Sequence, residues 1–475
     1  MRFAEYGRYD AIGLAELIAR KEISALDAVD EAIARAEELN PRLNAIVFKD
    51  YERARDAAKK NPGGALAGVP MFLKDMRAHC IGMVTRSGSR FTSDQPSTFD
   101  STLVKRYKDA GLVPLGKTNV PEFGIMPVTE SRLWGTAENP WKTGITAGGS
   151  SGGSAVAVAA RIVPVAHATD GGGSIRIPAS CCGLVGLKVS RGRITQGPDA
   201  ADATSGLSVD NCVSRTVRDT ALMLDLTSAP DYGDPYFALQ PDGPYLEGIG
   251  TRPRRLKIAV ALKSPEGSAF NGQVLEAMKN TVKLLEQLGH RVEEANPAID
   301  HATTRVAFMT LWATNGAYAI ETLARALGRT PCLDYLEPIT FALYERGKTL
   351  FGYQQIWAVQ MLHRAAREAA KFHEAYDLWL TPTLAQLPFP HGMIDREESD
   401  VHKAFAPVMY HVPFTSLQNA TGQPAINLPL AMSKEGLPIG VQFVARAGDE
   451  MTLLKLAAEI EDAAPWIGRA PKLED

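Results

Sequence analysis

The sequence predicts an α/β fold in which a mixed or parallel β-sheet carries helices on its faces. Short apolar runs alternate with helical patterns from residue 43 to residue 166. A strand-like run and a helical pattern follow each other again at 256–260 and 271–289. Hydrophobic residues make up 45% and charged residues 22% of the 475 positions, a composition typical of folded rather than disordered proteins.

The predicted elements of the N-terminal half alternate between helices with apolar residues three and four apart and short apolar strands. In order, they are helices at 11–20 and 24–40, a strand at 43–47, a helix at 51–60, a strand at 68–75, a helix at 101–110, and strands at 112–115 and 164–166. Ser24 is the expected N-cap of the second helix, which should stop at Asn40-Pro41. The strand at 68–75 is unusual because its apolar run carries a lysine, Lys74.

The C-terminal half is predicted to be mainly helical. Its expected elements are a helix at 216–227, a strand at 256–260, a helix at 271–289, a largely helical region at 303–373, strands at 378–380, 425–428 and 439–444, and a helix at 450–463. Residues 232–253 are rich in Pro, Gly and Asp and form either a linker or a surface loop. We favour the loop, because the second half has few strands of its own. Five aromatic residues are candidates to line a pocket, although core packing is the commoner role: Trp312, Tyr318, Phe341, Phe351 and Trp357.

Charge, hydropathy and cysteine content exclude several classes of protein. The net charge of −3 leaves no basic surplus for binding nucleic acid. No apolar run reaches the roughly 18 residues of a membrane span, and the N-terminus lacks the pattern of a signal peptide. The five cysteines form no CxxC pair. We therefore expect a cytoplasmic protein without disulfides.

Glycine is concentrated in one segment. Residues 144–192 hold 11 of the 41 glycines, where an even distribution would place about four. The segment contains GGSSGGS at 148–154 and DGGGSIRIP at 170–178, so it needs backbone freedom or close backbone approach. A phosphate-binding loop is not supported, because neither GxxxxGK[ST] nor GxGxxG occurs in it.

The second glycine run has the features of an acyl-transfer site. Such chemistry needs a nucleophile, a base and N–H donors for the developing oxyanion. The backbone N–H groups of Gly171, Gly172, Gly173 and Ser174 are candidates for an oxyanion hole, with Ser174 as the nucleophile. His167 lies nearby but in an apolar run, which favours a core residue.

Neither a metal nor a thiol is favoured for this chemistry. The nine histidines form no HExxH or HxH motif, which leaves metal catalysis unsupported. Cys181 and Cys182 have no basic partner in the sequence, so buried thiols are the better interpretation.

Lys74 is the alternative base. Its pKa would have to fall from about 10.4 to 7 or 8, a change of about 4 kcal/mol that burial away from carboxylates supplies. A structural ion pair with Asp75, Asp170 or another carboxylate is the competing role. Residue chemistry leaves both roles open.

These motifs together resemble the amidase signature family of serine hydrolases. The two glycine runs and the upstream G-V-P-x-x-x-K-D at 68–75 occur in the order typical of the family, and 24 residues separate Ser150 from Ser174, the spacing typical of the family. Shorter matches at 115–119, 139–141, 422–425 and 436–442 extend the resemblance over nearly the whole chain.

The resemblance implies one α/β domain over residues 1–475 with a mixed sheet of ten or eleven strands enclosed by helices. Within it we expect an N-terminal helical segment at 1–60, the catalytic core at 61–230 and a helical substrate-pocket region at 300–375.

The resemblance also implies roles for individual residues. Ser174 corresponds to the nucleophile, Ser150 to a bridging serine that follows a cis peptide bond, and Lys74 to the base. Three further residues would support the site: Ser151, Asp170 and Arg176. Residue 171 is Gly where many members carry a larger apolar residue, which we expect to loosen the loop. No cofactor or metal is implied.

The expected activity is amide hydrolysis through an acyl-enzyme, with a small-molecule amide as the partner. The sequence leaves the oligomeric state open, with a homodimer as one possible state. The substrate would be a small carboxamide, anilide, carbamate or nylon-type oligomer. The runs at 134–136, 139–141, 179–183 and 191–194 look most like the branch of the family that hydrolyses the cyclic nylon dimer, with its soluble bacterial relatives. The alternative is a glutamyl-tRNA amidotransferase A-type subunit, which would release ammonia from glutamine with partner chains. An inactive binding scaffold is disfavoured, because Lys74, Ser150 and Ser174 are all present.

Overall fold

In the computed structural model, which describes residues 3, 5–265 and 267–473, the chain is built around one mixed sheet. The described residues contribute eleven strands in the order β1-β3-β2-β6-β8-β7-β12-β13-β11-β9-β10. They are β1 (Ile46–Lys49), β2 (Pro70–Lys74), β3 (Val113–Thr118), β6 (Val165–Asp170), β7 (Val185–Lys188), β8 (Val209–Ser214), β9 (Lys257–Val260), β10 (Arg291–Glu294), β11 (Leu378–Pro382), β12 (Ala425–Met432) and β13 (Pro438–Ala445). A separate two-stranded sheet joins β4 (Glu130–Ser131) to β5 (Gly135–Thr136).

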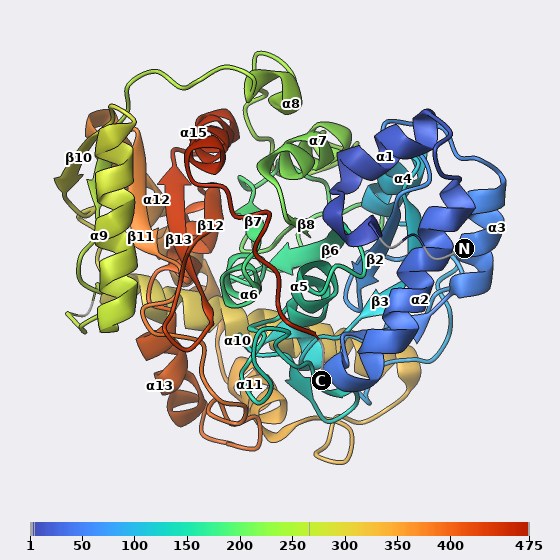
Figure 1. Ribbon diagram of the computed structural model, residues 1–475. Helices are drawn as coiled ribbons and strands as arrows, with labels where there is room; N and C mark the ends of the chain where they lie inside the picture. The colour runs from blue at the N-terminus through green and yellow to red at the C-terminus, as the bar shows by residue number, and fades with distance from the viewer. Residues whose placement is uncertain (1–2, 4, 266, 474–475) are drawn as a thin grey trace.

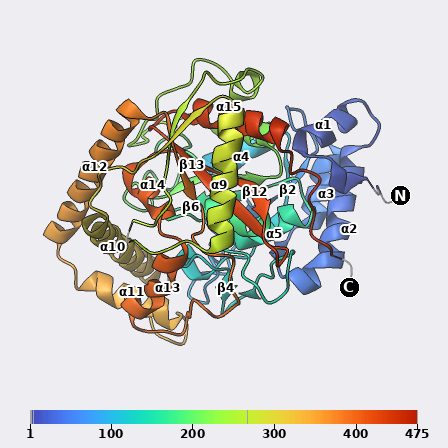
Figure 2. The same cartoon turned by 60° about the vertical axis from the view of Figure 1, so that its left-hand side comes forward.

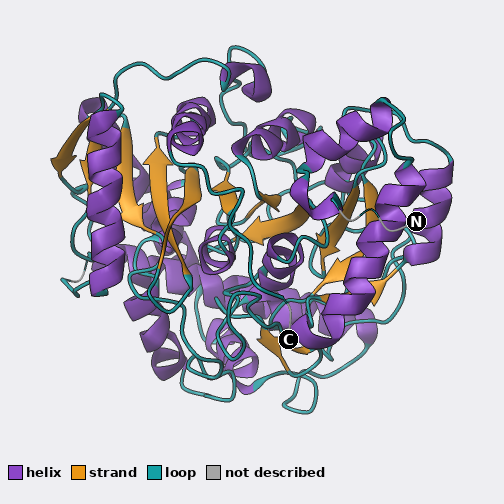
Figure 3. Ribbon diagram, in the orientation of Figure 1, coloured by secondary structure: helices purple, strands orange, loops and turns teal. Residues whose placement is uncertain are grey.

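Helices enclose this sheet, as Figure 3 shows. They are α1 (Ala11–Ala19), α2 (Ala25–Leu43), α3 (Tyr51–Lys59), α4 (Thr102–Asp109), α5 (Gly152–Ala159), α6 (Arg176–Cys182), α7 (Val217–Thr227), α8 (Tyr245–Gly248), α9 (Gly272–Gln287), α10 (His301–Leu327), α11 (Pro338–Lys348), α12 (Gly352–Ala375), α13 (Val401–His411), α14 (Thr415–Thr421) and α15 (Glu450–Ala463), with short 3-10 turns η1 (Tyr6–Arg8) and η2 (Glu122–Gly124). The predicted single α/β domain with ten or eleven strands is confirmed.

The sheet brings the two motif-bearing strands together. Strands β2 and β6 are parallel neighbours, with Met71 opposite Val165. Because the carboxyl ends of parallel neighbours lie at the same edge of a sheet, Lys74 at the end of β2 lies beside the end of β6. The glycine run at 170–174 leaves the sheet at that same edge.

Helices α5 and α6 begin at the two glycine runs and lie at the centre of the molecule (Figure 1). All residues of both helices are buried. A helix that is apolar all round belongs in a core, and the Ala/Val-rich sequence of α5 meets that requirement. The starts of both helices are therefore held by packing on every side.

Helices α10, α11 and α13 pack together on one side of the sheet, where Figures 1 and 2 show them as neighbours. They share a small apolar cluster that includes Ala313, Leu343 and Ala404, one residue from each helix. This layer faces the glycine run and forms the outer wall of the cavity described below.

Two element predictions need correction. Helix α2 does not stop at Asn40-Pro41 but continues to Leu43, because Asn44 still donates its backbone N–H to the Asn40 carbonyl and caps the last turn in the left-handed region. Ser24 caps its start as predicted. The loop at 232–253 contains the short helix α8, which the Pro- and Gly-rich composition concealed.

Three strands lacked an apolar signal. Strand β10 is the charged edge strand Arg291–Glu294, and charged side chains are common on edge strands. Strand β8 is fully buried, yet it carries Asp210 and Asn211. Strand β7 is only four residues long, Val185–Lys188, and also carries a buried lysine.

Candidate active site

Lys74 is completely buried at the end of β2 and contacts two hydroxyl groups. Its Nζ lies 2.7 Å from Ser150 Oγ and 2.7 Å from Thr169 Oγ1, within hydrogen-bonding distance of both. Among the described residues, no carboxylate forms an ion pair with it; Asp75 instead accepts hydrogen bonds from the Arg86 backbone and the Trp134 indole. The ion-pair role that the sequence left open is therefore wrong.

Burial lowers the pKa of Lys74 to about 7. The nearby charges of Asp210 and Asp170 oppose this shift, and that of Arg77 adds to it. An amine with a pKa of about 7 is largely unprotonated just above neutral pH, as a general base must be.

Ser150 lies on the loop that precedes α5, and the Gly149–Ser150 peptide bond is cis. Gly149 is needed because a Cβ atom there would lie 2.4 Å from the Val128 carbonyl oxygen. Ser151 bonds to the backbone N–H and carbonyl of Thr169, both at 3.2 Å. This pair of bonds fixes the start of α5 to the end of β6.

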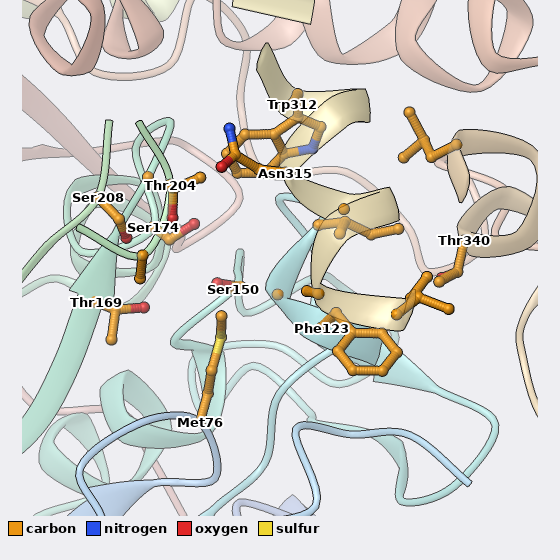
Figure 4. A pocket seen from close by; sticks show the side chains of 18 residues that line it. Met76, Phe123, Ser150, Thr169, Ser174, Thr204, Ser208, Trp312, Asn315 and Thr340 are labelled. Carbon is orange, nitrogen blue, oxygen red and sulfur yellow. The ribbon is translucent and has the colours of Figure 1, made fainter. Parts of the chain in front are cut away.

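Ser174 lies just before α6, and its side chain borders a cavity of about 130 Å³ that Ser150 and Thr169 also line. Figure 4 shows Ser174 with Thr204 and Ser208 on one side of this cavity and Phe123 on the other. The hydrogen bonds of the described residues include one between Lys74 and Ser150 but none between Ser150 and Ser174. Catalytic hydrogen bonds are often incomplete without substrate.

A buried ion pair holds the glycine run in place. Arg176 binds both carboxylate oxygens of Asp170, at 3.0 Å from Nε and 2.9 Å from Nη2. Burial alone would raise the pKa of Asp170, but the attraction of the Arg176 guanidinium outweighs burial and the pKa falls to about 2. The remaining guanidinium hydrogen bonds go to Thr415, Gln418, Asn419 and Gln442.

Those four partners of Arg176 were not predicted. They lie about 240 to 270 residues further along the chain, and no spacing rule connects them to the glycine run. Thr169 was also missed, although it immediately precedes Asp170 in the motif.

The backbone donors around Ser174 are not equivalent. Gly173 donates its N–H to Asp170 Oδ1 at 2.8 Å. The N–H groups of Gly171, Gly172 and Ser174 have no partner within the described part of the chain. Three of the four predicted oxyanion donors are therefore available to a ligand.

The loop is not loosened by Gly171, contrary to the expectation from its small size. Thr415 donates to the Gly172 carbonyl at 2.7 Å, and Asp170 holds Gly173. A Cβ atom at residue 171 would lie 3.2 Å from two carbons of the Trp312 indole. Trp312 thus fills the space that a larger residue would occupy.

The other candidate nucleophiles and bases have structural roles. His167 is fully buried: its Nδ1 accepts the Lys74 backbone N–H, and its Nε2 lies 3.2 Å from Asp210 Oδ1. Cys181 and Cys182 are buried, and burial raises the pKa of the Cys181 thiol to about 12. The predictions of a core histidine and buried thiols are confirmed.

The pocket prediction for the aromatic residues is only partly correct. Trp312 lines the cavity, and Phe341 packs beside Tyr344. The other three are on the surface, with exposed fractions of 70% for Tyr318, 65% for Phe351 and 39% for Trp357. Helical periodicity alone did not distinguish the inward face from the outward face.

The described residues contain no cluster of three or more His, Cys, Asp or Glu side chains that could hold a metal ion. None of the helices, over those same residues, is long and apolar enough to cross a membrane.

Comparison with known proteins finds similarity to amidases in both sequence and structure. The amidase family model matches residues 27–454. The 6-aminohexanoate-cyclic-dimer hydrolase of Paenarthrobacter ureafaciens is 36% identical over 480 residues, which cover 98% of this chain and 96% of that protein. A solved structure of 6-aminohexanoate cyclic dimer hydrolase complexed with substrate matches with a TM-score of 0.95 and 35% identity, covering 99% of this chain and 100% of that one. A glutamyl-tRNA(Gln) amidotransferase subunit from Thermotoga maritima matches over the full length of both chains with a TM-score of 0.78 and 26% identity.

Proposed function

Because this chain belongs to the amidase family and is therefore an amide hydrolase, we propose that Lys74, Ser150 and Ser174 form its catalytic triad. The observation that carries the proposal is the 2.7 Å contact between the buried Lys74 amine and Ser150, in the same cavity as Ser174. A buried lysine bonded to hydroxyls rather than to a carboxylate is suited to accept a proton.

In this mechanism Ser174 Oγ attacks the amide carbonyl carbon. Its proton passes to Ser150, and the Ser150 proton passes to Lys74 Nζ. The N–H groups of Gly171, Gly172 and Ser174 stabilise the oxyanion, a type of contribution worth about 3 to 4 kcal/mol for one donor. The same protons return through Ser150 to the amide nitrogen as the C–N bond breaks.

Water then hydrolyses the acyl-enzyme. Lys74 accepts the water proton through Ser150, the ester bond to Ser174 breaks, and the proton returns to Ser174 Oγ. Asp170 and Arg176 position the glycine run and touch no reacting atom, and Ser151 fixes the start of α5.

The substrate we propose is a small amide: a carboxamide, anilide, carbamate or nylon-type oligomer, cyclic forms included. The similarity to 6-aminohexanoate cyclic dimer hydrolase supports this class. Residues 300–375 act as the substrate-pocket region, since α10 and α11 line the cavity with side chains such as Trp312, Asn315 and Leu343.

The amidotransferase alternative is less well supported. Glutamine carries an ammonium group, and no Asp or Glu lines the cavity to pair with it. The relative with that function also matches at lower identity, 26% against 35%.

Turnover and covalent labelling of the purified chain test the proposal. A fluorophosphonate probe should label Ser174, and the chain should hydrolyse members of a panel of anilides, carbamates and nylon oligomers faster than glutamine. Hydrolysis of glutamine alone would favour the amidotransferase function. Labelling of a different residue, with turnover retained after Ser174→Ala, would contradict the triad.

A further inference from the structure

Two neighbouring spaces, called lobes below, share part of their lining at Ser174. One lobe contains Ser150 and is called the Ser150 lobe; the other contains Phe405 and is called the Phe405 lobe. Ser174 and Trp312 line both. The proposed nucleophile therefore lies at the junction of two spaces, one for each side of a scissile amide bond.

Helix α10 borders both lobes. Before Trp312, Phe308 and Met309 line the Phe405 lobe; after it, the small residues Gly316 and Ala319 line the Ser150 lobe, together with Asn315 and Ile320. These residues are spaced by three or four and share one helix face. Phe308 stacks on Trp312 with ring centroids 5.3 Å apart. Trp312 therefore contributes to the wall of both lobes, and Phe308 stacks on it within the Phe405 lobe.

Helix α13 provides the opposite wall of the Phe405 lobe. Phe405, Val408 and Met409 lie on one face of this helix and point their apolar side chains at the lobe. Apart from Arg305, the lining residues of this lobe are uncharged. Hydroxyl groups line both lobes, with Thr415 and Ser416 in the Phe405 lobe, but a side-chain amide, that of Asn315, lines the Ser150 lobe alone.

We infer that the acyl part of the substrate occupies the Phe405 lobe and the amine part occupies the Ser150 lobe, an inference that rests on the proposed function. When the C–N bond breaks, the amide nitrogen takes its proton from Ser150 and leaves as the amine, while the carbonyl carbon stays bonded to Ser174. Ser150 lines only one lobe. The nitrogen must therefore face the Ser150 lobe, which directs the acyl group to the other side of Trp312.

This orientation defines the chemical class of substrate. No Asp or Glu lines either lobe, so an ammonium group near the scissile bond would lose water without gaining a partner. The apolar walls of the Phe405 lobe suit an alkyl or aryl acyl group. The small residues Gly316 and Ala319 leave room for an uncharged amine or aniline.

Filling each lobe separately tests the assignment. Gly316→Leu adds a side chain where a Cβ atom meets nothing within 4 Å, so the helix should tolerate it. We expect Gly316→Leu to lower kcat/KM for hexanoyl p-nitroanilide relative to hexanamide by about 10-fold, because only the anilide fills the amine side. We expect Met409→Trp, with Val408→Phe as a second variant, to lower kcat/KM for hexanoyl relative to acetyl p-nitroanilide by about 10-fold.

Tyr318→Leu is the matched control, since Tyr318 is on α10 but 70% exposed and outside both lobes; it should leave both ratios unchanged. The orientation alone would be overturned if each variant changed the kcat/KM ratio expected for the other. It would also be overturned if both variants were active and neither changed its ratio. Absence of both turnover and Ser174 labelling in the unmodified chain would overturn the proposed function and the orientation with it.

Discussion

The indole ring of Trp312 lies against the backbone of Gly171, so that a Cβ atom at residue 171 would come within 3.2 Å of two ring carbons. Gly171 lines the Ser150 lobe and its backbone N–H has no partner among the described residues, while Trp312 lines both lobes. The glycine and the tryptophan, 141 positions apart, therefore depend on each other.

We expect Gly171→Ala to lower kcat/KM by about 10-fold, because the new methyl group displaces the indole or the loop at a cost of about 1–3 kcal/mol. Trp312→Leu should make room, so the double variant should lose less activity than the two single losses combined. A double-mutant cycle on kcat/KM measures this coupling. Gly272→Ala, on the exposed start of α9 where a Cβ meets nothing, is the control. If the losses of the two single variants simply add in the double variant, the contact between Gly171 and Trp312 does not affect activity.

Removing the proposed nucleophile or base should abolish turnover without unfolding the chain. Ser174→Ala and Lys74→Ala are each expected to lower kcat by about four orders of magnitude, as in other enzymes whose triad members act together. Circular dichroism and thermal unfolding check the fold of both variants. Substantial amidase activity in folded Ser174→Ala would contradict the proposed nucleophile.

Activity should rise with pH through the pKa of Lys74. Burial lowers this pKa to about 7, so the neutral amine that acts as the base dominates only above pH 7. We expect the rising limb of kcat/KM against pH to have its midpoint near 7. Asp210→Asn should move it to lower pH, because the Asp210 charge raises the pKa of Lys74. If the midpoint of the rising limb does not move in Asp210→Asn, the group that titrates is not Lys74.

Removing one partner of the buried Asp170–Arg176 ion pair should lower the free energy of unfolding. Arg176→Met leaves the Asp170 carboxylate without its partner, and such losses typically destabilise a protein by about 3–5 kcal/mol. Urea unfolding measures the change. Arg218→Met, which removes a partly exposed partner of Asp10, offers a comparison that should cost less. Equal losses in the two variants would argue against a special role for the buried pair.

Thiol reagents should leave the enzyme active. Cys80, Cys181, Cys182 and Cys212 are buried, and burial raises the pKa of each thiol. We expect iodoacetamide at pH 7 to modify at most Cys332, as read by peptide mass spectrometry, with unchanged amide hydrolysis. Rapid inactivation with labelling of Cys181 would show that this buried region opens.

Local sequence was enough to predict much of the fold. The N-cap Ser24, the apolar spacing of α1 and the run ending at Lys74 all predicted elements at nearly the right positions. Prediction failed where polar groups enter the sheet, as Asp210 does in β8, or where charge marks an edge, as in β10. In those strands the neighbouring strands, and not hydropathy, account for the structure.

For the candidate site, the local glycine pattern suggested Ser174 and its N–H donors, whereas the proposed roles of Ser150 and Lys74 came from the resemblance to a family. The surroundings of those residues in the folded protein could not be predicted from the sequence. Whether Lys74 is an ion-pair partner or a neutral base depends on its complete burial and on Thr169 from another strand. The Arg176 guanidinium is held by hydrogen bonds to Gln418 and Asn419 from α14. Side chains from α10 and α13 form walls of the lobes. Local patterns are set by backbone periodicity and turn chemistry, whereas pKa values and cavity walls come from segments that meet only when the chain folds.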